Sequence, residues 1–219
     1  MHIPDGYLDP TIIAITWAVT IPFLIFAWKK TKKTYSHSIA PTLAITSALV
    51  FVVQMINFPI AGGTTVHVLG VTLLAVILGP FPAMLSMTMV LLMQAFFFAD
   101  GGLLAFGANA LNMAVIGSLS FFIVKLLTRK TSSNKQFASS VFIASWVAAL
   151  LTALATGLEL GFSKAFAGGV MLTVPSMVSV YAIEGLVEAV ITTALVTSLQ
   201  RLQPAVMMGL KLLRGSEKL

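Results

Sequence analysis

Apolar residues dominate seven stretches of this chain, and short polar segments separate them. The apolar stretches cover residues 11–28, 39–58, 67–78, 81–98, 104–127, 137–158 and 170–199. A helix needs about 20 apolar residues to cross the hydrocarbon core of a bilayer, and all but the short third stretch come close to that length. The pattern predicts an all-α, polytopic integral membrane protein with seven transmembrane helices.

Basic residues follow alternate apolar stretches. They occur at 29–33, 125–135 and 201–218, whereas Lys164 stands apart. Seven crossings place all of them except Lys164 on one side of the membrane. Because Lys and Arg are enriched in cytoplasmic loops, the N-terminus is predicted outside and the C-terminus in the cytoplasm. The formal net charge of +6 is then a topology signal, and nucleic acid is not an expected partner.

Composition supports the same class of protein. The chain is 58% hydrophobic and 9% charged, whereas soluble domains carry about 25% charged residues. It contains no cysteine, which excludes disulfides, thiolate metal sites, iron–sulfur clusters and cysteine nucleophiles. Since no linker, repeat or low-complexity tract divides the sequence, residues 1–219 are predicted to form a single domain surrounded by membrane lipids.

The first two residues bring three nitrogen atoms together. The Met1 amine and the His2 amide close a five-membered chelate ring on a metal, and the amide and His2 Nδ1 close a six-membered ring. Such a tetragonal nitrogen set favours Ni(II) or Cu(II) and leaves a fourth corner open. Retention of Met1 is expected because the second residue is bulky. The alternative is an ordinary frayed terminus.

A second histidine is predicted on the same side of the membrane as Met1. The glycines at 62–63 end the second stretch, and Thr64 or Thr65 can cap the next helix. His67 is then expected in the first helical turn of the third stretch. An ionisable residue there is a functional candidate that supplies the missing fourth nitrogen. The alternative is a histidine hydrogen-bonded to loop backbone.

Other polar residues have weaker claims to function. His37 lies in a basic loop and is interpreted as solvated. Asp100, Asn109 and Asn112 lie near the start of the fifth stretch, where an unsatisfied polar group is costly. They are candidates to orient His67 or the terminal peptide. Helix capping and loop hydrogen bonding are the alternative roles.

Glu184 and Glu188 lie one helical turn apart in the seventh stretch. Paired carboxylates in a membrane can carry protons, so an ion- or proton-coupled secondary metal transporter that uses Glu184 and Glu188 is the alternative function. Buried structural acids are the other interpretation. A membrane metalloenzyme is disfavoured, because the chain has no His-Glu-x-x-His or similar cluster.

Three motifs together resemble a known family. The start Met1-His2-Ile3-Pro4-Asp5-Gly6 and the stretches 63–67 and 100–110 are similar to the substrate-binding component of nickel/cobalt energy-coupling factor transporters, the NikM/CbiM type. The resemblance implies seven helices and an N-terminus that folds inward. It implies the Met1 amine, the His2 amide and imidazole and the His67 imidazole as metal ligands. The transported substrate would be Ni(II), with Co(II) as the alternative, and no cofactor is expected.

The resemblance also implies partners. The sequence has no Gly-x-x-x-x-Gly-Lys-[Ser/Thr] phosphate-binding loop, so the chain is predicted to be a non-catalytic transport subunit. The family works with a transmembrane coupling protein, two ABC-type ATPase subunits and often a small accessory membrane protein, in the prokaryotic cytoplasmic membrane. Ala40, Ala44 and Ala48 form a small-residue stripe that is expected to meet the coupling protein. Packing against a neighbouring helix of the same chain is the alternative.

Overall fold

Long apolar helices make up most of the chain. A computed structural model describes residues 1–35, 39–59, 65–128 and 133–213. Within these residues, five helices are long and apolar enough to cross a membrane. They are α1 (Pro10–Thr34), α4 (Pro80–Phe98), a composite helix over Phe106–Leu127, α7 (Asn134–Phe162) and α8 (Gly169–Leu202). Their length and composition agree with the predicted polytopic helical architecture.

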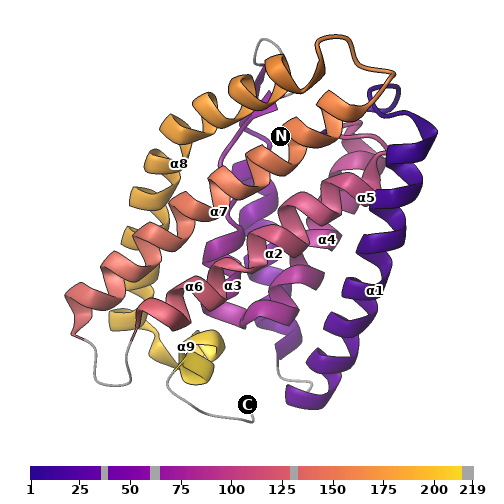
Figure 1. Ribbon diagram of the computed structural model, residues 1–219. Helices are drawn as coiled ribbons and strands as arrows, with labels where there is room; N and C mark the ends of the chain where they lie inside the picture. The colour runs from indigo at the N-terminus through magenta and orange to yellow at the C-terminus, as the bar shows by residue number, and fades with distance from the viewer. Residues whose placement is uncertain (36–38, 60–64, 129–132, 214–219) are drawn as a thin grey trace.

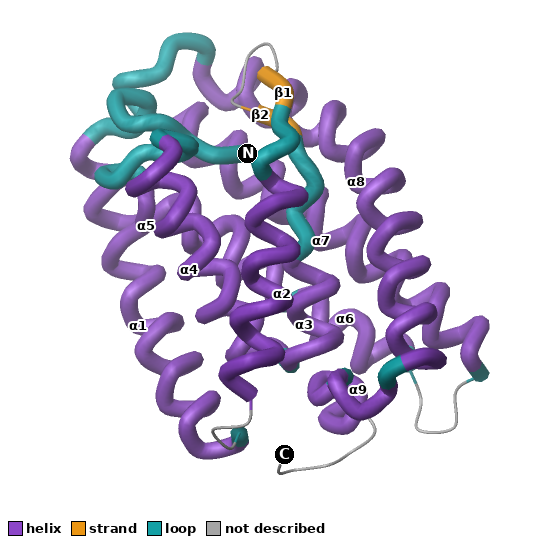
Figure 2. The backbone as a smooth tube through the Cα atoms, turned by 180° about the vertical axis from the view of Figure 1, so that it is seen from behind, coloured by secondary structure: helices purple, strands orange, loops and turns teal. Residues whose placement is uncertain are grey.

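The remaining elements are shorter. The composite helix consists of α5 (Phe106–Asn109), the π-helical η1 (Ala110–Ile116) and α6 (Ser120–Leu127). The others are α2 (Ile39–Gln54), β1 (Phe58–Pro59), β2 (Thr65–Val66), α3 (Val71–Leu78), η2 (Pro204–Val206) and α9 (Met208–Leu213). Strands β1 and β2 pair antiparallel, so a small hairpin interrupts the predicted all-α pattern. It lies at the same end of the molecule as the N-terminal segment (Figure 2).

Small residues let α7 and α8 pack as a close antiparallel pair (Figure 1). Gly157 and Gly161 follow one another at a spacing of four on α7 and face α8. A methyl group added at Gly157 would lie 2.9 Å from the Val174 backbone, and one at Gly161 would lie 2.6 Å from the Val170 backbone. Thr173 also donates a hydrogen bond to the Gly157 carbonyl at 2.6 Å. Glycine at these positions therefore allows the two backbones to approach closely.

The short helix α3 lies at the centre of the bundle. All of its residues are buried, and it contacts α2, α4, α6, α7, α8 and α9. Helix α9 packs against it from the end where the C-terminus lies (Figure 1). Gly209 permits this contact, because a methyl group there would lie 2.8 Å from the Ala75 carbonyl oxygen. The apolar core therefore surrounds a helix of only eight residues.

The chain before α3 is not helical, which corrects the prediction for the third apolar stretch. Helix α3 begins at Val71 after Gly70, and Thr65 lies in β2, so Thr65 does not cap the helix. Thr64 lies outside the described residues. His67 is in the non-helical segment between β2 and α3 and not in a first helical turn. Gly70 has a φ of 71°, a left-handed conformation that glycine adopts without strain and that separates this segment from the helix.

Polar side chains from other helices satisfy the backbone of this buried segment. Glu188 of α8 accepts hydrogen bonds from the amides of Leu69 at 2.8 Å and Gly70 at 3.0 Å. Gln54 of α2 donates to the Leu69 carbonyl at 2.5 Å. An unpaired backbone group at this depth costs about 1–3 kcal/mol, so these contacts make a non-helical segment possible inside the bundle. Glu188 is thus a structural acid that hydrogen-bonds to a neighbouring element.

Candidate metal centre

The N-terminal segment folds into the molecule. Met1 and Ile3 have no exposed surface, and His2 is 2% exposed. Asn109 hydrogen-bonds to both main-chain groups of Ile3: its Oδ1 accepts from the Ile3 amide at 2.8 Å, and its Nδ2 donates to the Ile3 carbonyl at 3.0 Å. The Gly102 amide donates to the same carbonyl at 2.9 Å. Both main-chain polar groups of Ile3 are therefore hydrogen-bonded, to the Asn109 side chain of α5 and to the loop before α5.

Asp5 makes a second set of hydrogen bonds between the N-terminal segment and the chain before α5. Its carboxylate accepts hydrogen bonds from the amides of Leu103, Leu104 and Ala105 at 2.9–3.0 Å. These amides precede helix α5, so the charge also lies at the positive end of a helix. Gly102 is needed here, because a methyl group at that position would collide with Asp5. The Asp5-Gly6 motif of the terminal segment and the Gly101-Gly102 motif before α5 are therefore in direct contact through Asp5 and Gly102.

The Met1 amine is buried among oxygen atoms. It donates to the carbonyl of Thr65 and, at 2.9 Å, to the Thr65 Oγ1. The hydroxyl of Tyr181 on α8 donates to the same Thr65 carbonyl at 3.1 Å. Burial lowers the pKa of the amine from 8.0 to about 4, although the nearby Asp100 and Glu184 raise it. The amine is therefore neutral at pH 7 and carries a lone pair that can bind a metal ion.

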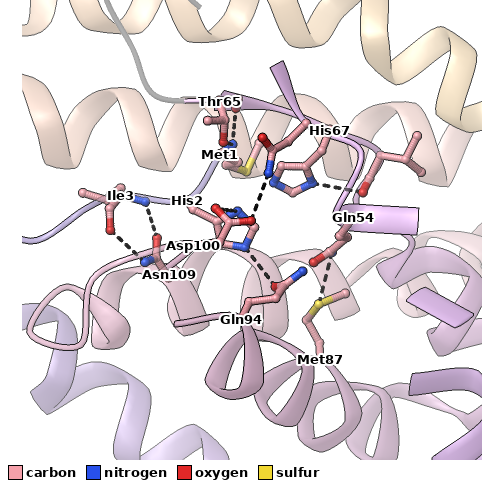
Figure 3. Close-up of polar contacts among 12 residues, drawn as sticks. Met1, His2, Ile3, Gln54, Thr65, His67, Met87, Gln94, Asp100 and Asn109 are labelled. Atoms are coloured by element: carbon pink, nitrogen blue, oxygen red, sulfur yellow. Dashed lines mark hydrogen bonds and ion pairs between the residues drawn. The ribbon is translucent and has the colours of Figure 1, made fainter. Parts of the chain in front are cut away.

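The rings of His2 and His67 lie against each other. Their centroids are 4.6 Å apart, with 27° between the ring planes, and the residues are 2% and 3% exposed (Figure 3). His2 Nε2 lies 3.1 Å from Gln94 Oε1, and His67 Nδ1 lies 3.0 Å from the Val68 carbonyl. His2 Nδ1 and His67 Nε2 have no hydrogen-bond partner among the residues that the structure describes. Each imidazole thus keeps one buried nitrogen unused.

Asp100 lies close to one of these nitrogens. Its Oδ1 is 3.3 Å from His2 Nδ1, and its Oδ2 accepts from Asn57 at 3.0 Å. Burial lowers the pKa of His2 to about 3, so its ring is neutral at pH 7 and the contact is not an ion pair there. Burial raises the pKa of the Asp100 carboxyl. A carboxylate and an imidazole lone pair at this separation would repel each other unless a proton or a metal ion reduced the repulsion.

Among the described residues, no three His, Cys, Asp or Glu side chains gather into a metal-binding group. A nitrogen site beside the two histidines therefore needs main-chain nitrogen ligands in addition to the side chains. The His2 amide has no hydrogen-bond acceptor among the described residues. It lies between the Met1 amine and the His2 ring, as the chelate geometry requires. The structure thus brings Met1, His2 and His67 together, and Asp100 and Asn109 border them.

The other predicted residues lie elsewhere. The Asn112 amide donates to Thr156 and Glu159 of α7, and among the described residues it makes no hydrogen bond to His2 or His67. Both carboxyl oxygens of Glu184 are buried, and residues 1–35, 39–59, 65–128 and 133–213 offer them no hydrogen-bond partner. Ala40, Ala44 and Ala48 are all exposed on α2, and Ala48 lines a groove between α2 and α4. His37 lies outside the described residues.

Sequence reasoning missed Gln54, Gln94, Glu159 and the role of Asp5. The two glutamines stand singly in apolar helices with no partner nearby in the sequence, so no local pattern marks them. Glu159 was detectable as an acid within the sixth apolar stretch. Asp5 belongs to the recognised terminal motif, but the backbone amides that donate hydrogen bonds to it lie about a hundred residues away.

Comparison with known proteins decides the family. A family model described as "Cobalt uptake substrate-specific transmembrane region" matches residues 2–206. The chain belongs to this family. It is 38% identical over 218 residues to the "Fused nickel transport protein NikMN" of Rhodobacter capsulatus, covering 93% of this chain and 63% of that protein. It is 34% identical to the "Cobalt transport protein CbiM" of Lachnoclostridium phytofermentans, covering 90% and 82%.

A solved structure of a similar protein supports the assignment. A crystal structure described as that of a truncated transition metal transporter superimposes with a TM-score of 0.86 at 40% sequence identity. The match covers 92% of this chain and 99% of that one. This CbiM-family chain nevertheless spans only 63% of the Rhodobacter capsulatus relative, which is named as a fused protein.

Proposed function

We propose that this chain is the substrate-binding membrane subunit of a nickel-specific energy-coupling factor transporter, with Co(II) as the alternative cargo. The observation that carries the proposal is the burial of the Met1 amine beside two stacked histidines that each retain a free nitrogen. Family membership and relatives named as nickel and cobalt transport proteins support it. No resident cofactor is required.

The ligands would be the Met1 amine, the His2 amide and Nδ1, and the His67 Nε2. Four nitrogens in one plane suit Ni(II), whose preferred geometries include the square-planar one. Binding would remove the amide proton and leave one net positive charge on the metal with its ligands. Asp100, beside His2 Nδ1, is placed to balance that charge when it is ionised. The proposal requires a mature chain that starts at Met1.

We further propose seven crossings of a prokaryotic cytoplasmic membrane, with the N-terminus outside. Helix α3 is only about 12 Å long, which is too short to cross alone. The non-helical residues 65–70 add up to about 20 Å, and together the two parts reach the roughly 30 Å of the hydrocarbon core. The C-terminal ends of α1, α6 and α8 point toward one end of the molecule, which the basic residues would make cytoplasmic (Figure 1).

The partners would be a transmembrane coupling protein, two ABC-type ATPase subunits and a small accessory membrane protein. The exposure of Ala40, Ala44 and Ala48 on α2 supports a contact with the coupling protein, because small exposed residues let another helix approach closely. Beside this stripe, Ala48, Phe51 and Met93 line an apolar groove between α2 and α4. This groove extends the apolar area available to a partner helix.

The first experiment tests the ligands. Untagged protein is purified, its metal is identified by elemental analysis, and Ni(II) affinity is measured by calorimetry. Either His2→Ala or His67→Ala should remove most of the binding, while His37→Ala should leave it intact. If both histidine variants bind Ni(II) like the unmodified protein, the proposed site is wrong.

A second experiment tests the terminus. A removable tag is placed before Met1, which converts the amine to an amide. High-affinity binding should be absent with the tag and return after cleavage to the native start, with native mass spectrometry confirming that Met1 is first. Equal affinity with and without the tag would rule out the chelate.

Glu184 keeps a second candidate function open, because its buried carboxyl oxygens have no partner. A proton-coupled secondary metal transporter would use this group and would need no ATPase. Vesicles containing the chain alone, and vesicles containing the chain with its partners and ATP, separate the two functions. Proton-driven uptake by the chain alone, abolished in Glu184→Gln, would favour the secondary transporter.

A further inference from the structure

Two fully buried glutamines lie beneath the stacked histidines, and the proposed ligands leave their purpose unexplained. Gln94 of α4 and Gln54 of α2 have no exposed surface. A neutral imidazole carries one proton, and its hydrogen bonds decide which ring nitrogen holds that proton. Gln94 Oε1 can only accept, so His2 Nε2 must be the protonated nitrogen that donates to it across 3.1 Å.

The orientation of the Gln94 amide is critical. With its nitrogen toward His2, it would donate to Nε2 and force the proton onto Nδ1. That nitrogen would then point its proton at Asp100 Oδ1, 3.3 Å away, and could not bind a metal ion. Some other group must therefore distinguish the two orientations of Gln94.

Gln54 can distinguish the two orientations of Gln94, because the Leu69 carbonyl fixes the orientation of the Gln54 amide. Its Nε2 donates to the Leu69 carbonyl at 2.5 Å and to the Met87 sulfur at 3.5 Å. Both are acceptors, so the amide nitrogen of Gln54 must face them. Its Oε1 is thereby turned the other way and has no partner.

The unpartnered atoms of the two glutamines are complementary. Gln54 retains a free acceptor, Oε1, and Gln94 retains a free donor, Nε2. These two atoms point toward each other in Figure 3. With the opposite Gln94 orientation, two oxygen atoms would face each other in a buried place, which is unfavourable. No hydrogen bond joins these two atoms in the part of the chain that the structure describes, so Gln54 favours the observed orientation of Gln94 by matching a free acceptor with a free donor.

We propose that Gln94, oriented by Gln54, is a positioning residue that holds His2 in the tautomer with Nδ1 free. His67 has the opposite tautomer, because the Val68 carbonyl accepts from its Nδ1 and leaves Nε2 free. The tautomer assignment rests on the hydrogen bonds alone, while its importance for affinity rests on the proposed function.

Nitrogen NMR of the metal-free protein tests the tautomer directly. The chain contains three histidines, so ¹⁵N-histidine labelling gives three pairs of ring signals, and His37→Asn removes one pair. Protonated and unprotonated ring nitrogens resonate far apart. At neutral pH, His2 should show a protonated Nε2 and an unprotonated Nδ1, and His67 should show the reverse. A protonated Nδ1 on His2 would overturn the proposal without any variant.

Gln94→Met removes the acceptor while keeping a side chain of similar length. His2 should then lose its single tautomer, and Ni(II) affinity should fall by about 10- to 100-fold, as is typical when a group that orients a ligand is lost. Ser86→Ala is the matched control, since Ser86 is a buried polar residue on the same helix whose partner is Ser47. It should change neither the tautomer nor the affinity.

The outcomes separate this inference from the proposed function. An unchanged His2 tautomer in Gln94→Met overturns the positioning role, whatever the affinity does. A changed tautomer with unchanged affinity shows that Nδ1 is not a ligand and overturns the functional part. If His2→Ala and His67→Ala keep normal Ni(II) binding, the proposed metal site fails, but the spectrum of the metal-free protein still decides the tautomer.

Discussion

At the scale of single residues, the buried terminal amine is the most consequential group. An amine in water is protonated at neutral pH and must lose a proton before it can bind a metal ion. Here burial lowers its pKa to about 4 and that of His2 to about 3. Folding therefore favours the unprotonated amine and keeps the His2 ring neutral, so the amine loses its proton on folding and not on metal binding.

A prediction about protons follows. At pH 7 the amide proton of His2 should be the main one released, so Ni(II) binding should release about one proton per metal ion. Affinity should then rise about tenfold per pH unit near neutrality, and more steeply below about pH 4, where Met1 becomes protonated. Calorimetry in buffers of different ionisation enthalpy measures the number. Release of two or more protons at pH 7 would show that the amine is protonated before binding.

Asn109 offers a second test at this scale. Asn109→Ala leaves the buried Ile3 amide unpaired and removes one of the two donors to the Ile3 carbonyl, which should cost about 1–3 kcal/mol of stability. It should also weaken Ni(II) binding, because Asn109 no longer holds Ile3, and with it Met1 and His2, in place against α5.

Asn112→Ala is the control, since Asn112 is equally buried but contacts α7. Thermal unfolding and Ni(II) calorimetry compare the two variants. Both should lose stability, but only Asn109→Ala should lose affinity. Equal affinities would contradict the role given to Asn109.

The sequence identified the two histidines as candidate ligands, but it did not identify all of the residues that contact the histidines and the terminal segment. His2 and His67 stand out because ionisable residues are rare in such an apolar chain. Gln94 and Asn109 act through contacts 92 and 106 residues away in sequence, which no local pattern encodes. Asn112 resembles Asn109 in sequence as a polar residue near membrane depth, but its amide contacts α7 and not the terminal segment.

At the scale of elements, the segment between β2 and α3 determines where His67 lies. Apolar periodicity alone extends the helix to His67, because Val68 and Leu69 look like helical core residues. Contacts from two other helices stabilise the non-helical backbone instead, through Glu188 and Gln54. The long helices follow from composition, whereas this interruption depends on tertiary contacts.

The two acids of α8 should therefore respond differently to amidation. Glu188→Gln keeps one acceptor oxygen for two backbone amides, so it should lose about 1–3 kcal/mol of stability. Glu184→Gln removes no hydrogen bond and should change stability little. Both should retain Ni(II) binding. Thermal unfolding with and without Ni(II) measures each effect, and loss of Ni(II) binding in Glu184→Gln alone would contradict the assignment.

At the scale of the whole molecule, orientation in the membrane decides which side supplies the metal. The terminal segment, the β1–β2 hairpin and the loop before α5 gather at one end, opposite the C-terminal helix α9 (Figure 2). The α7–α8 connection, which contains Lys164, lies at the first of these ends (Figure 1). If this end faces outward, as proposed, metal from outside meets the site before it meets the core.

The absence of native cysteine makes this orientation directly testable. Single cysteines replace Lys164 and, in a second protein, Lys30, and a membrane-impermeant thiol reagent is added to intact cells. Lys164→Cys should react, and Lys30→Cys should react only after the membrane is opened. The reverse pattern would invert the proposed topology, and equal labelling in intact cells would contradict a spanning arrangement.

The proposed ligands belong to two separately anchored parts of the chain. Asn109, Asp5 and Gln94 anchor the segment with Met1 and His2 to α4 and α5, whereas α2 and α8 anchor the segment with His67. A metal ion bound to both parts is a cross-link, and its binding energy opposes their separation. A partner that separates the two parts must therefore lower the affinity for the metal. By thermodynamic reciprocity, the bound metal lowers the affinity for that partner by the same factor.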